Sequence, residues 1–533
     1  MAAPTYSEDL TDIDLAEPAS TGWTAFNISG GGGGAPAFGA DLGMQGLGCW
    51  DKPCSNAERG LAVNKTPGAG TVAAGVHIFV WGFCATPGIT DNLATRGAYV
   101  LIGTGTSDYV QFHVEGNDTY GAGGRVGKCY VVDYVTTANT GSVPYRTVGG
   151  TPGATPTYFG YGLKTTATAK GSNMGCDAIR YGTGAYITAG DGTTPATFDG
   201  FATQNDSINN RWGILTAVGG GYELQGRFVV GQNNSKVATA AHFDDSNRVI
   251  SIIDTPHSTT DFTQIIVDHA STVFNMTNVT ILSLGTNNPG RLVFNNASTT
   301  AALTGCTFDT LGLTTLRAGV TADGCTWRTT DQITQNGATI TNCFIENNSN
   351  AAAILSDAPN LISNTRFTSD GTGYAIEIDT PGTYTFTGNT FSGYAATDGT
   401  TGNECIFNNS SGAVTINVGG GGDTPTIRNG AGASTTVNNN KTVTFTGLKD
   451  NSEVRIYLAA DGSVVDGIED ATAGTTDNRT FAWSASAGTV VDYVIHNWQP
   501  GVAVYESIRV DGYTVPANDT SIAVQQRLDR NAE

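Results

Sequence analysis

The phrase Leu303-Thr-Gly-Cys306-Thr-Phe308 is followed by four further copies before Phe391, and this repeat decides the fold. The copies share an apolar or small first residue, Gly or Asn in third place and a large apolar sixth residue. They are Ala322-Asp-Gly-Cys325-Thr-Trp327, Ile340-Thr-Asn-Cys343-Phe-Ile345, Ile362-Ser-Asn-Thr365-Arg-Phe367 and Phe386-Thr-Gly-Asn389-Thr-Phe391. The fourth residues lie 19, 18, 22 and 24 positions apart. A period near 20 in a strand-forming sequence predicts a β-solenoid.

Each phrase predicts a bend between two short strands. Gly or Asn forms the corner because these residues tolerate a positive φ. The first, fourth and sixth residues then point inward, by the two-residue period of a strand. Stacked rungs therefore predict a buried core ladder of the fourth residues, which are Cys306, Cys325, Cys343, Thr365 and Asn389.

Asparagine pairs recur in the expected turns. They are Asn295-Asn296, Asn347-Asn348 and Asn408-Asn409. We expect them to form an asparagine ladder, in which stacked side-chain amides hydrogen-bond from rung to rung.

With this rung pattern the chain resembles the right-handed parallel β-helix proteins, among them pectate-lyase-like enzymes and the tail spikes of bacteriophages. The resemblance implies an architecture and a virion setting, and it brings no catalytic motif with it.

The composition agrees with many short strands and tight turns. The 533 residues include 71 Gly, only 14% are charged, and the formal net charge is −21. This acidity argues against nucleic acid or an anionic membrane as partner. The first residues lack the basic and apolar regions of a signal peptide, and no apolar run is long enough to span a membrane. We therefore expect synthesis in a host cytoplasm and release by a route such as lysis.

Four segments are predicted in an all-β chain. They are an acidic arm (1–20), a β-sandwich (21–181), the parallel β-helix (182–437) and a C-terminal β-sandwich (438–533). The second segment resembles concanavalin-A-like jelly rolls, and the last resembles transthyretin-like or immunoglobulin-like sandwiches. The jelly-roll resemblance implies a glycan-binding surface. Its candidate stacking residues are Trp50, Trp81, Tyr109 and Tyr120, with core packing as the alternative for each.

The search for chemistry yields one constellation. In Ala375-Ile-Glu377-Ile-Asp379 the two carboxylates should point outward about 7 Å apart, as a glycosidase acid and base would. Asp357 and Asp370 lie on the flanking loops. The alternatives are a solvated acidic patch or a bound Ca²⁺, and no other cofactor or metal is expected.

Nine cysteines are present. Those of the ladder are expected as buried thiols, with disulfides between adjacent rungs as the alternative. Cys49 and Cys54 form the one close pair, which predicts a loop disulfide in an oxidising medium.

Three functions are compatible with these observations. The first is a non-enzymatic bacteriophage virion structural protein, such as a capsid decoration, head fibre or tail appendage, with weak host-glycan adhesion. The second is a tail-spike depolymerase, and the third is a secreted lyase or adhesin. We expect a homotrimer that binds other virion proteins. Its acidic arm should dock on a basic partner, because an arm of this composition should be ordered only when something holds it.

Overall fold

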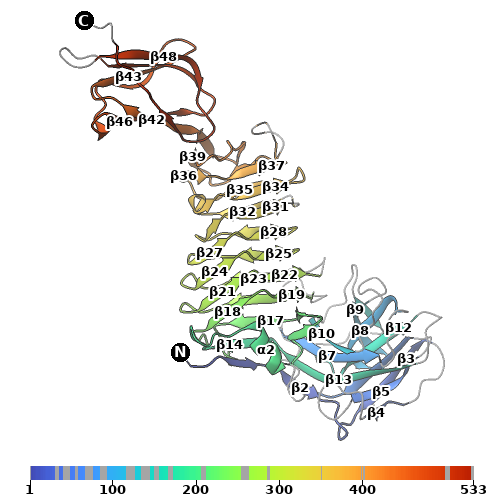
Figure 1. The fold of residues 1–533 in the computed structure, drawn as a ribbon. Helices are drawn as coiled ribbons and strands as arrows, with labels where there is room; N and C mark the ends of the chain where they lie inside the picture. Colours follow the sequence, from blue (N-terminus) through green and yellow to red (C-terminus); the bar gives the residue numbers. More distant parts are fainter. Residues whose placement is uncertain are drawn as a thin grey trace. The chain divides into compact units, whose positions relative to one another are not determined.

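The computed structural model describes most of the chain, which divides into two compact units (Figure 1). The described residues are 2–29, 35–39, 49–54, 58–66, 76–84, 93–115, 127–133, 145–148, 155–165, 172–205, 212–253, 263–284, 289–347, 349, 351–395, 397, 399, 402–497 and 504–529. The first unit comprises Met1–Val320 and Cys325–Asp331, and the second comprises Thr321–Gly324 and Gln332–Glu533.

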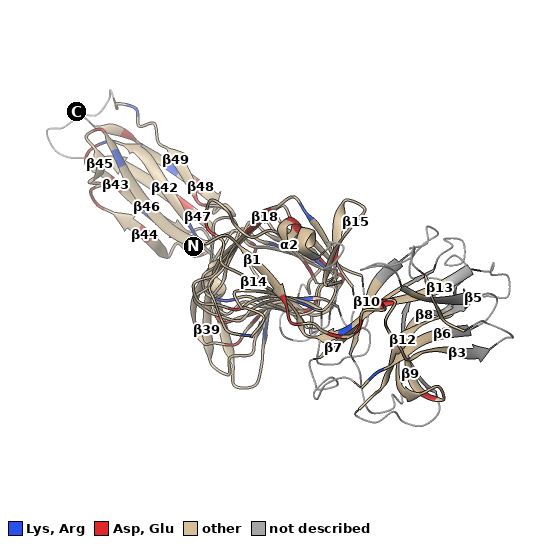
Figure 2. Cartoon of the chain, turned by 90° about the horizontal axis from the view of Figure 1, so that it is seen from below, with Lys and Arg blue, Asp and Glu red and all other residues tan. Residues whose placement is uncertain are grey.

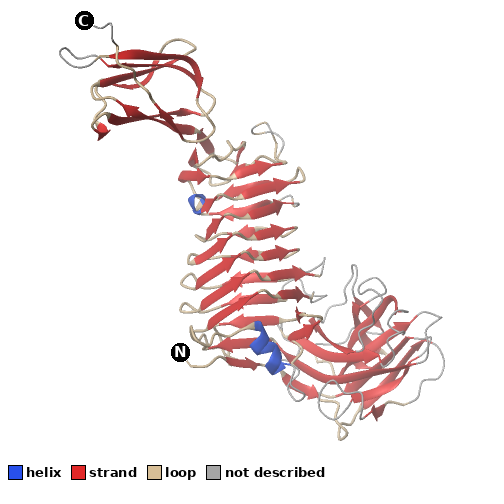
Figure 3. Ribbon diagram, in the orientation of Figure 1, coloured by secondary structure: helices blue, strands red, loops and turns tan. Residues whose placement is uncertain are grey.

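The fold is all-β, as predicted, with 58% strand and 3% helix. Figure 3 shows α2 (Phe198–Asn205) and the short 3₁₀ helix η1 (Pro359–Leu361) as the helical elements of the described chain. Neither of these helices is long and apolar enough to cross a membrane.

Two antiparallel sheets form a sandwich in the first unit. One sheet has the order β10 (Gly127–Asp133), β7 (His77–Cys84), β13 (Ser172–Gly182), β5 (Cys49–Cys54) and β4 (Ala37–Gly39), with β2 (Thr11–Asp14) beside β13. The other has the order β11 (Tyr145–Val148), β9 (Asp108–Glu115), β8 (Leu93–Gly105), β12 (Tyr158–Thr165), β6 (Glu58–Asn64) and β3 (Trp23–Ser29). Inward residues of both sheets make one apolar core, as alternating strands dictate.

Three long sheets of 11, nine and nine strands, here called sheets 1, 2 and 3, are built almost entirely of parallel strands. The antiparallel strand β1 (Thr5–Glu8) lies at one edge of sheet 1. Sheet 1 in the first unit holds β14 (Gly184–Thr188), β17 (Arg227–Val230), β20 (Gln264–Val267), β23 (Arg291–Phe294) and β26 (Thr314–Thr315). Sheet 2 there holds β15 (Leu215–Val218), β16 (Gly221–Leu224), β19 (Val249–Ile252), β22 (Thr280–Ser283), β25 (Thr307–Asp309) and β28 (Thr326–Arg328). Sheet 3 there holds β18 (His242–Ser246), β21 (Val273–Thr277) and β24 (Thr300–Thr304). The chain visits sheets 1, 3 and 2 in turn, so each circuit is one rung of a parallel β-helix.

The second unit continues with rungs of the same kind. Its sheet 1 strands are β29 (Ile333–Thr334), β32 (Ala352–Ser356), β35 (Tyr374–Ile378), β38 (Ile406–Asn408) and β40 (Ile427–Asn429). Its sheet 2 strands are β31 (Phe344–Asn347), β34 (Arg366–Ser369) and β37 (Thr390–Ser392). Its sheet 3 strands are β27 (Val320–Asp323), β30 (Thr339–Thr341), β33 (Ile362–Ser363), β36 (Gly382–Thr387), β39 (Ala413–Gly419) and β41 (Ser434–Asn438).

The repeated phrase is the corner from sheet 3 to sheet 2. Its third residue has a positive φ in every copy: 61° at Gly305, 64° at Gly324, 54° at Asn342, 49° at Asn364 and 68° at Gly388. The first residues are buried, and so are the sixth residues except Phe391, which is half-buried. The corner sequence thus sets the backbone and the inward columns together.

The asparagine ladder is wrong as predicted, because its members occupy different corners. Asn347 ends the sheet 2 strand β31, whereas Asn408 ends the sheet 1 strand β38. Each donates its own amide hydrogen to a backbone carbonyl of the next rung, Asn347 to Tyr374 and Asn408 to Ser434.

Helix α2 covers the apolar interior at the first rungs. Phe198 and Phe201 are fully buried and contact Phe228 at centroid distances of 5.3 and 5.2 Å. Phe243 lies 4.9 Å from both Phe198 and Phe274. A solenoid needs such a cap because its end rung would otherwise leave its core in water.

The acidic arm is held by its own chain. β1 (Thr5–Glu8) pairs antiparallel with β14, and β2 pairs with β13 of the sandwich. Asp9 accepts hydrogen bonds from the backbone amides of Thr183 (2.8 Å) and Gly184 (2.9 Å). Figure 2 shows the acidic residues of the arm in this part of the chain. The reasoning that only a partner orders this arm is therefore wrong, since its sheet partners lie within the first unit.

The second unit ends in a two-sheet sandwich. One sheet has the order β45 (Ala473–Thr475), β46 (Asn478–Ser486), β42 (Asn440–Leu448) and β49 (Thr520–Ala523). The other has the order β44 (Val464–Ile468), β43 (Ser452–Leu458), β47 (Val490–Asn497) and β48 (Tyr505–Thr514). Trp483 and Phe445 belong to the apolar core between them.

Candidate functional site

The predicted core ladder is built from side chains that hydrogen-bond to the preceding rung. The Sγ atoms of Cys306 and Cys325 donate to the carbonyl oxygens of Met276 (3.3 Å) and Leu303 (3.2 Å). The donors are fourth residues of their corners, and the acceptors are first residues one rung earlier.

The same pattern recurs in the second unit. Cys343 donates to Ala322 (3.6 Å), and the Nδ2 atom of Asn389 donates to Ile362 (2.8 Å). The backbone N–H of Thr365 donates to the Oδ1 atom of Asn389 (3.0 Å). All five ladder residues are at most 3% exposed.

The ladder cysteines are thiols rather than disulfides. The hydrogen bond from Cys325 and then burial raise the pKa of the Cys306 thiol far above its ordinary value. Because the thiolate is the reactive form, the Cys306 thiol is poorly suited to act as a nucleophile.

The predicted loop disulfide between Cys49 and Cys54 is wrong. Both residues lie at opposite ends of the extended strand β5, which separates their Cα atoms by roughly 16 Å. A disulfide requires a Cα separation under about 7 Å.

Three of the four aromatic candidates in the sandwich lie among the described side chains. Trp81 and Tyr109 are only 3% and 2% exposed. Both rings are buried and offer no face to a sugar, so glycan stacking is wrong for both. Trp50 is half-buried and stacks on Trp23 at 6.0 Å, with its Nε1 atom 3.4 Å from the Glu17 carbonyl. Tyr120 lies outside the described residues.

The predicted carboxylate pair lies on the outward side of sheet 1. Ile376 and Ile378 are fully buried, so Glu377 points outward, where its Oε1 atom accepts a 2.8 Å hydrogen bond from Asn409. Asp379 follows the end of β35, is exposed, and accepts from the Thr380 hydroxyl at 2.9 Å.

Each of the two flanking carboxylates accepts a hydrogen bond, Asp357 from a residue 20 positions earlier and Asp370 from a residue of its own turn. Asp357 accepts from the Gly337 amide (2.8 Å), and Asp370 accepts from the Thr372 hydroxyl (2.8 Å). Burial, followed by the charges of Asp379 and Asp357, raises the pKa of the Tyr384 hydroxyl. Among the described residues no group of three or more His, Cys, Asp or Glu side chains is arranged to hold a metal ion. A catalytic role for Glu377 and Asp379 stays a prediction.

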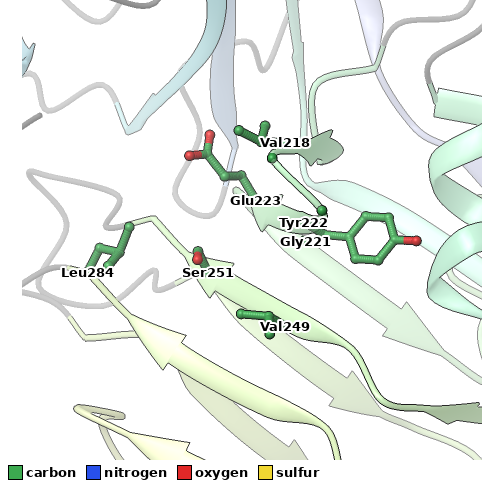
Figure 4. A pocket seen from close by; sticks show the side chains of 9 residues that line it. Val218, Gly221, Tyr222, Glu223, Val249, Ser251 and Leu284 are labelled. Carbon is green, nitrogen blue, oxygen red and sulfur yellow. The ribbon is translucent and has the colours of Figure 1, made fainter. Parts of the chain in front are cut away.

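The structure adds a pocket that the sequence did not predict. It lies on the outward side of sheet 2 in the first unit, has a cavity volume of about 360 Å³, and is shown in Figure 4. Its lining residues are Val218, Gly219, Gly220, Gly221, Tyr222, Glu223, Val249, Ser251 and Leu284. Ligand pockets in proteins start at about this volume.

Two strands and a tight turn position the polar groups of this pocket. Gly219 and Gly220 have φ values of 57° and 90°, which lets β15 fold back on β16. Glu223 of β16 lies directly beside Ser251 of β19 in the parallel register. Glu223 is only 6% exposed, although it lies on the outward side of the sheet.

Aliphatic side chains form the walls of the pocket. Val218, Val249 and Leu284 are 40%, 46% and 47% exposed, which is unusual for large apolar residues. The Tyr222 hydroxyl instead donates to Asp199 of α2 at 2.8 Å. Burial, then this bond, raises the pKa of Tyr222 to about 12. The pocket therefore holds the Glu223 carboxylate and the Ser251 hydroxyl between apolar walls.

The spacing of carboxylates along this face bears on catalysis. Glu223, Ser251, Leu282 and Asp309 follow one another in register on four neighbouring strands. Glu223 and Asp309 are thus three strand spacings apart, roughly 14 Å. Inverting glycosidases hold their two carboxyl groups about 6.5–9.5 Å apart, and retaining ones hold them closer. These two residues are too far apart to form such a pair.

Comparisons with known proteins supply no family for the chain. No family model and no curated protein matches it. Among solved structures it is similar to the catalytic domain of a GH87 α-1,3-glucanase variant bound to tetrasaccharides, with 9% identity and a TM-score of 0.19. The same domain bound to nigerose gives the same values, and in both cases 81% of this chain and 86% of the other are covered. Likeness at this level carries no inference about activity, so the function has to be argued from the residues of the chain.

Proposed function

We propose that the chain is a non-enzymatic structural protein of a bacteriophage virion that adheres weakly to a host glycan through the pocket beside Glu223. The observation that supports this proposal is that one cavity combines the buried Glu223, the neighbouring Ser251 hydroxyl and exposed aliphatic walls. Sugars present apolar C–H faces between hydroxyl groups, and a pocket of this kind matches both features. The next carboxylate in register with Glu223 is that of Asp309, roughly 14 Å away, which is too far for a glycosidase pair.

The β-helix suits a load-bearing spacer. Rung-to-rung hydrogen bonds from the ladder residues join the parallel ladders of three sheets. The virion setting is supported by the resemblance of the rung pattern to phage spikes. Immunogold labelling of purified particles with antibody to this chain tests it, and unlabelled particles would contradict it.

Glycan adhesion is tested with the pocket carboxylate. We expect Glu223→Gln to weaken binding of the chain to host polysaccharide in biolayer interferometry by about tenfold, because a hydrogen bond to a charged acceptor is lost. Asp309→Asn is the matched control, since it removes a carboxylate from the same outward column. Equal binding by the two variants would place adhesion elsewhere.

Cleavage remains the second candidate, because Glu377 on β35 and Asp379 just after its end are two positions apart, a backbone separation of about 7 Å, and a glycosidase works with two neighbouring carboxylates. Under the proposal, host polysaccharide releases no reducing ends on incubation with the chain. Release that disappears in the variant Glu377→Gln with Asp379→Asn would replace the proposal by a depolymerase.

Assembly completes the proposal as a homotrimer that docks on other virion proteins. Native mass spectrometry of the purified chain tests the trimer, and a monomer at working concentration contradicts it. Docking through the arm would require partners to reach residues already paired with β14, so a surface outside the arm is the alternative that pull-down with the purified virion proteins would separate.

A further inference from the structure

A second outward surface lies on sheet 1 of the second unit. Leu355, Glu377, Phe407 and Arg428 follow one another in register on β32, β35, β38 and β40. A carboxylate, an aromatic ring and a guanidinium therefore stand in that order at steps of about 4.8 Å. We call Glu377, Phe407 and Arg428, with Tyr374 and Asn409, the arginine shelf.

Arg428 is held on this shelf by aromatic residues. Its guanidinium lies 5.9 Å from the Tyr374 ring centroid and 5.8 Å from that of Phe407. Its Nη1 atom donates to the Tyr374 hydroxyl at 2.5 Å, and the two rings stack at 4.9 Å. A Cβ atom at Gly402 would come within 2.9 Å of Nη1, so the glycine leaves room for the guanidinium.

The charge of Arg428 has no carboxylate partner within ion-pair distance among the described residues. Three other arginines of the second unit do have one: Arg455 pairs with Glu453, Arg479 with Asp450 and Arg509 with Asp511. At the opposite end of the shelf Glu377 is occupied by Asn409. In a chain of net charge −21, the exposed Arg428 guanidinium, which is oriented by aromatic rings and has no carboxylate partner among the described residues, is a group that a ligand anion can pair with.

We infer that the arginine shelf binds a saccharide bearing a carboxylate, that is, a uronic acid unit of an acidic polysaccharide. The inference rests on the proposed glycan adhesion and names a ligand class for a site separate from the Glu223 pocket. The sugar carboxylate pairs with the Arg428 guanidinium, whose planar fork fits a carboxylate. The ring of the sugar lies against Phe407, and its hydroxyls reach the Glu377–Asn409 pair.

The arrangement also explains why a uronic acid is favoured over a neutral sugar. The surrounding negative charge of the chain repels an anionic polymer, so recognition depends on a local cation. The aromatic rings already hold Arg428 in place, so little side-chain entropy is lost when the anion binds.

The test uses two matched probes and two matched variants. The probes are a tetrasaccharide alternating glucuronic acid and N-acetylglucosamine and the same tetrasaccharide with its carboxyl groups reduced to alcohols. The variants are Arg428→Gln and the control Arg366→Gln, since Arg366 also lies over an aromatic ring, 5.7 Å from Phe344. Affinities come from calorimetry on the full chain, and thermal melting by circular dichroism verifies that each variant is folded.

We expect the wild-type chain to bind the acidic probe about tenfold more tightly than the reduced one, as a charge-assisted hydrogen bond implies. Arg428→Gln abolishes this preference, Arg366→Gln keeps it, and added salt weakens it. Equal affinity for both probes, absence of binding to either, or an equal loss in both variants would overturn the inference.

Glu223→Gln separates this inference from the proposed function. If neutral glycans bind in a Glu223-dependent manner while the acidic probe gains nothing, the shelf is overturned and the pocket stands. If the acidic preference depends on Arg428 and Glu223→Gln changes no affinity, the shelf is supported and the pocket is not the adhesion site.

Discussion

The same corner of the β-helix is built with two kinds of chemistry in the first unit. At the cysteine corners, Leu303 and Cys306 fill the first and fourth positions, and both are fully buried. In the first corner the corresponding residues are Asp245, which is in register with Met276, and Arg248. These two form an ion pair at 3.1 Å, and Asn247 between them has the expected positive φ of 55°.

The difference lies in what covers each corner. Asp245 also accepts the backbone N–H of Phe198 at 2.8 Å, so it satisfies the first turn of α2. A cysteine corner has a rung on the preceding side, whose carbonyl takes the thiol hydrogen. The corner sequence thus fixes the backbone turn, whereas the neighbour in the stack decides whether apolar or charged side chains suit it.

The largest expected effect is a charge placed in a cysteine corner. Cys325→Asp should lower the free energy of unfolding by about 3–5 kcal/mol, because the buried carboxylate has no cation to offset its desolvation. Cys325→Ala should cost about 1–2 kcal/mol from the lost volume alone. Urea denaturation followed by circular dichroism measures both. Equal losses in the two variants would show that this corner tolerates charge as the first corner does.

Removing the charge from the first corner should have an intermediate effect. Asp245→Ala should cost about 2 kcal/mol, since the Phe198 amide and Arg248 lose their acceptor. Arg248 is partly exposed, so solvent compensates part of its charge.

The double variant Asp245→Met with Arg248→Cys installs the chemistry of the later rungs. It should remain destabilised, because the Phe198 amide still lacks an acceptor. Wild-type stability in this variant would mean that the Asp245–Arg248 ion pair contributes only the volume of its side chains to the corner.

The smallest expected effect is a pH dependence near the arm. Burial, as the largest cause, raises the pKa of Tyr186 to about 12. The folded state therefore holds this proton more tightly than the unfolded state, in which tyrosine titrates near 10. The resulting stabilisation is complete below pH 10 and is lost as pH rises through 12.

Tyr186→Phe tests this dependence. It should be about 1 kcal/mol less stable than wild type at pH 8, because the hydroxyl bonds to Thr183 and Asp9 are lost. Its stability should then fall less steeply between pH 10 and 12. Parallel curves for the two proteins in urea titrations at each pH would contradict the assignment.

The sequence predicted the rung architecture because one local signal repeats. Gly305 and Asn342 both have a positive φ, and the flanking apolar residues follow the two-residue period of a strand. The same short sequence therefore predicts both the corner and the buried core residues. The asparagine ladder failed because Asn347 and Asn408 look equivalent in sequence and yet end strands of different sheets. Helix α2 was not predicted because it is only eight residues long and because Gly200 and Thr203 are poor helix formers.

The candidate sites were harder to predict, since outward residues show no burial pattern. Glu223 and Ser251 meet only because the register of β16 and β19 brings them together across 28 positions. Phe407 and Arg428 meet in the same way. Exposed aliphatic residues such as Val218 beside a glycine turn were the available signal. The sandwich aromatics misled in a different way, because Trp81 and Tyr109 lie on the faces of β7 and β9 that point away from the sandwich core and are nevertheless buried there.

The pairing of β1 with β14 has a consequence for biosynthesis. Thr5 lies opposite Thr188, so the arm leaves the ribosome 183 residues before its partner strand does. At typical elongation rates of about 5–20 residues per second, that interval is roughly 10 to 40 s. Over this time β1 has no partner strand, while the sandwich strands that lie between β1 and β14 in the sequence are being made. The β1–β14 pair can therefore form only after those sandwich strands have left the ribosome.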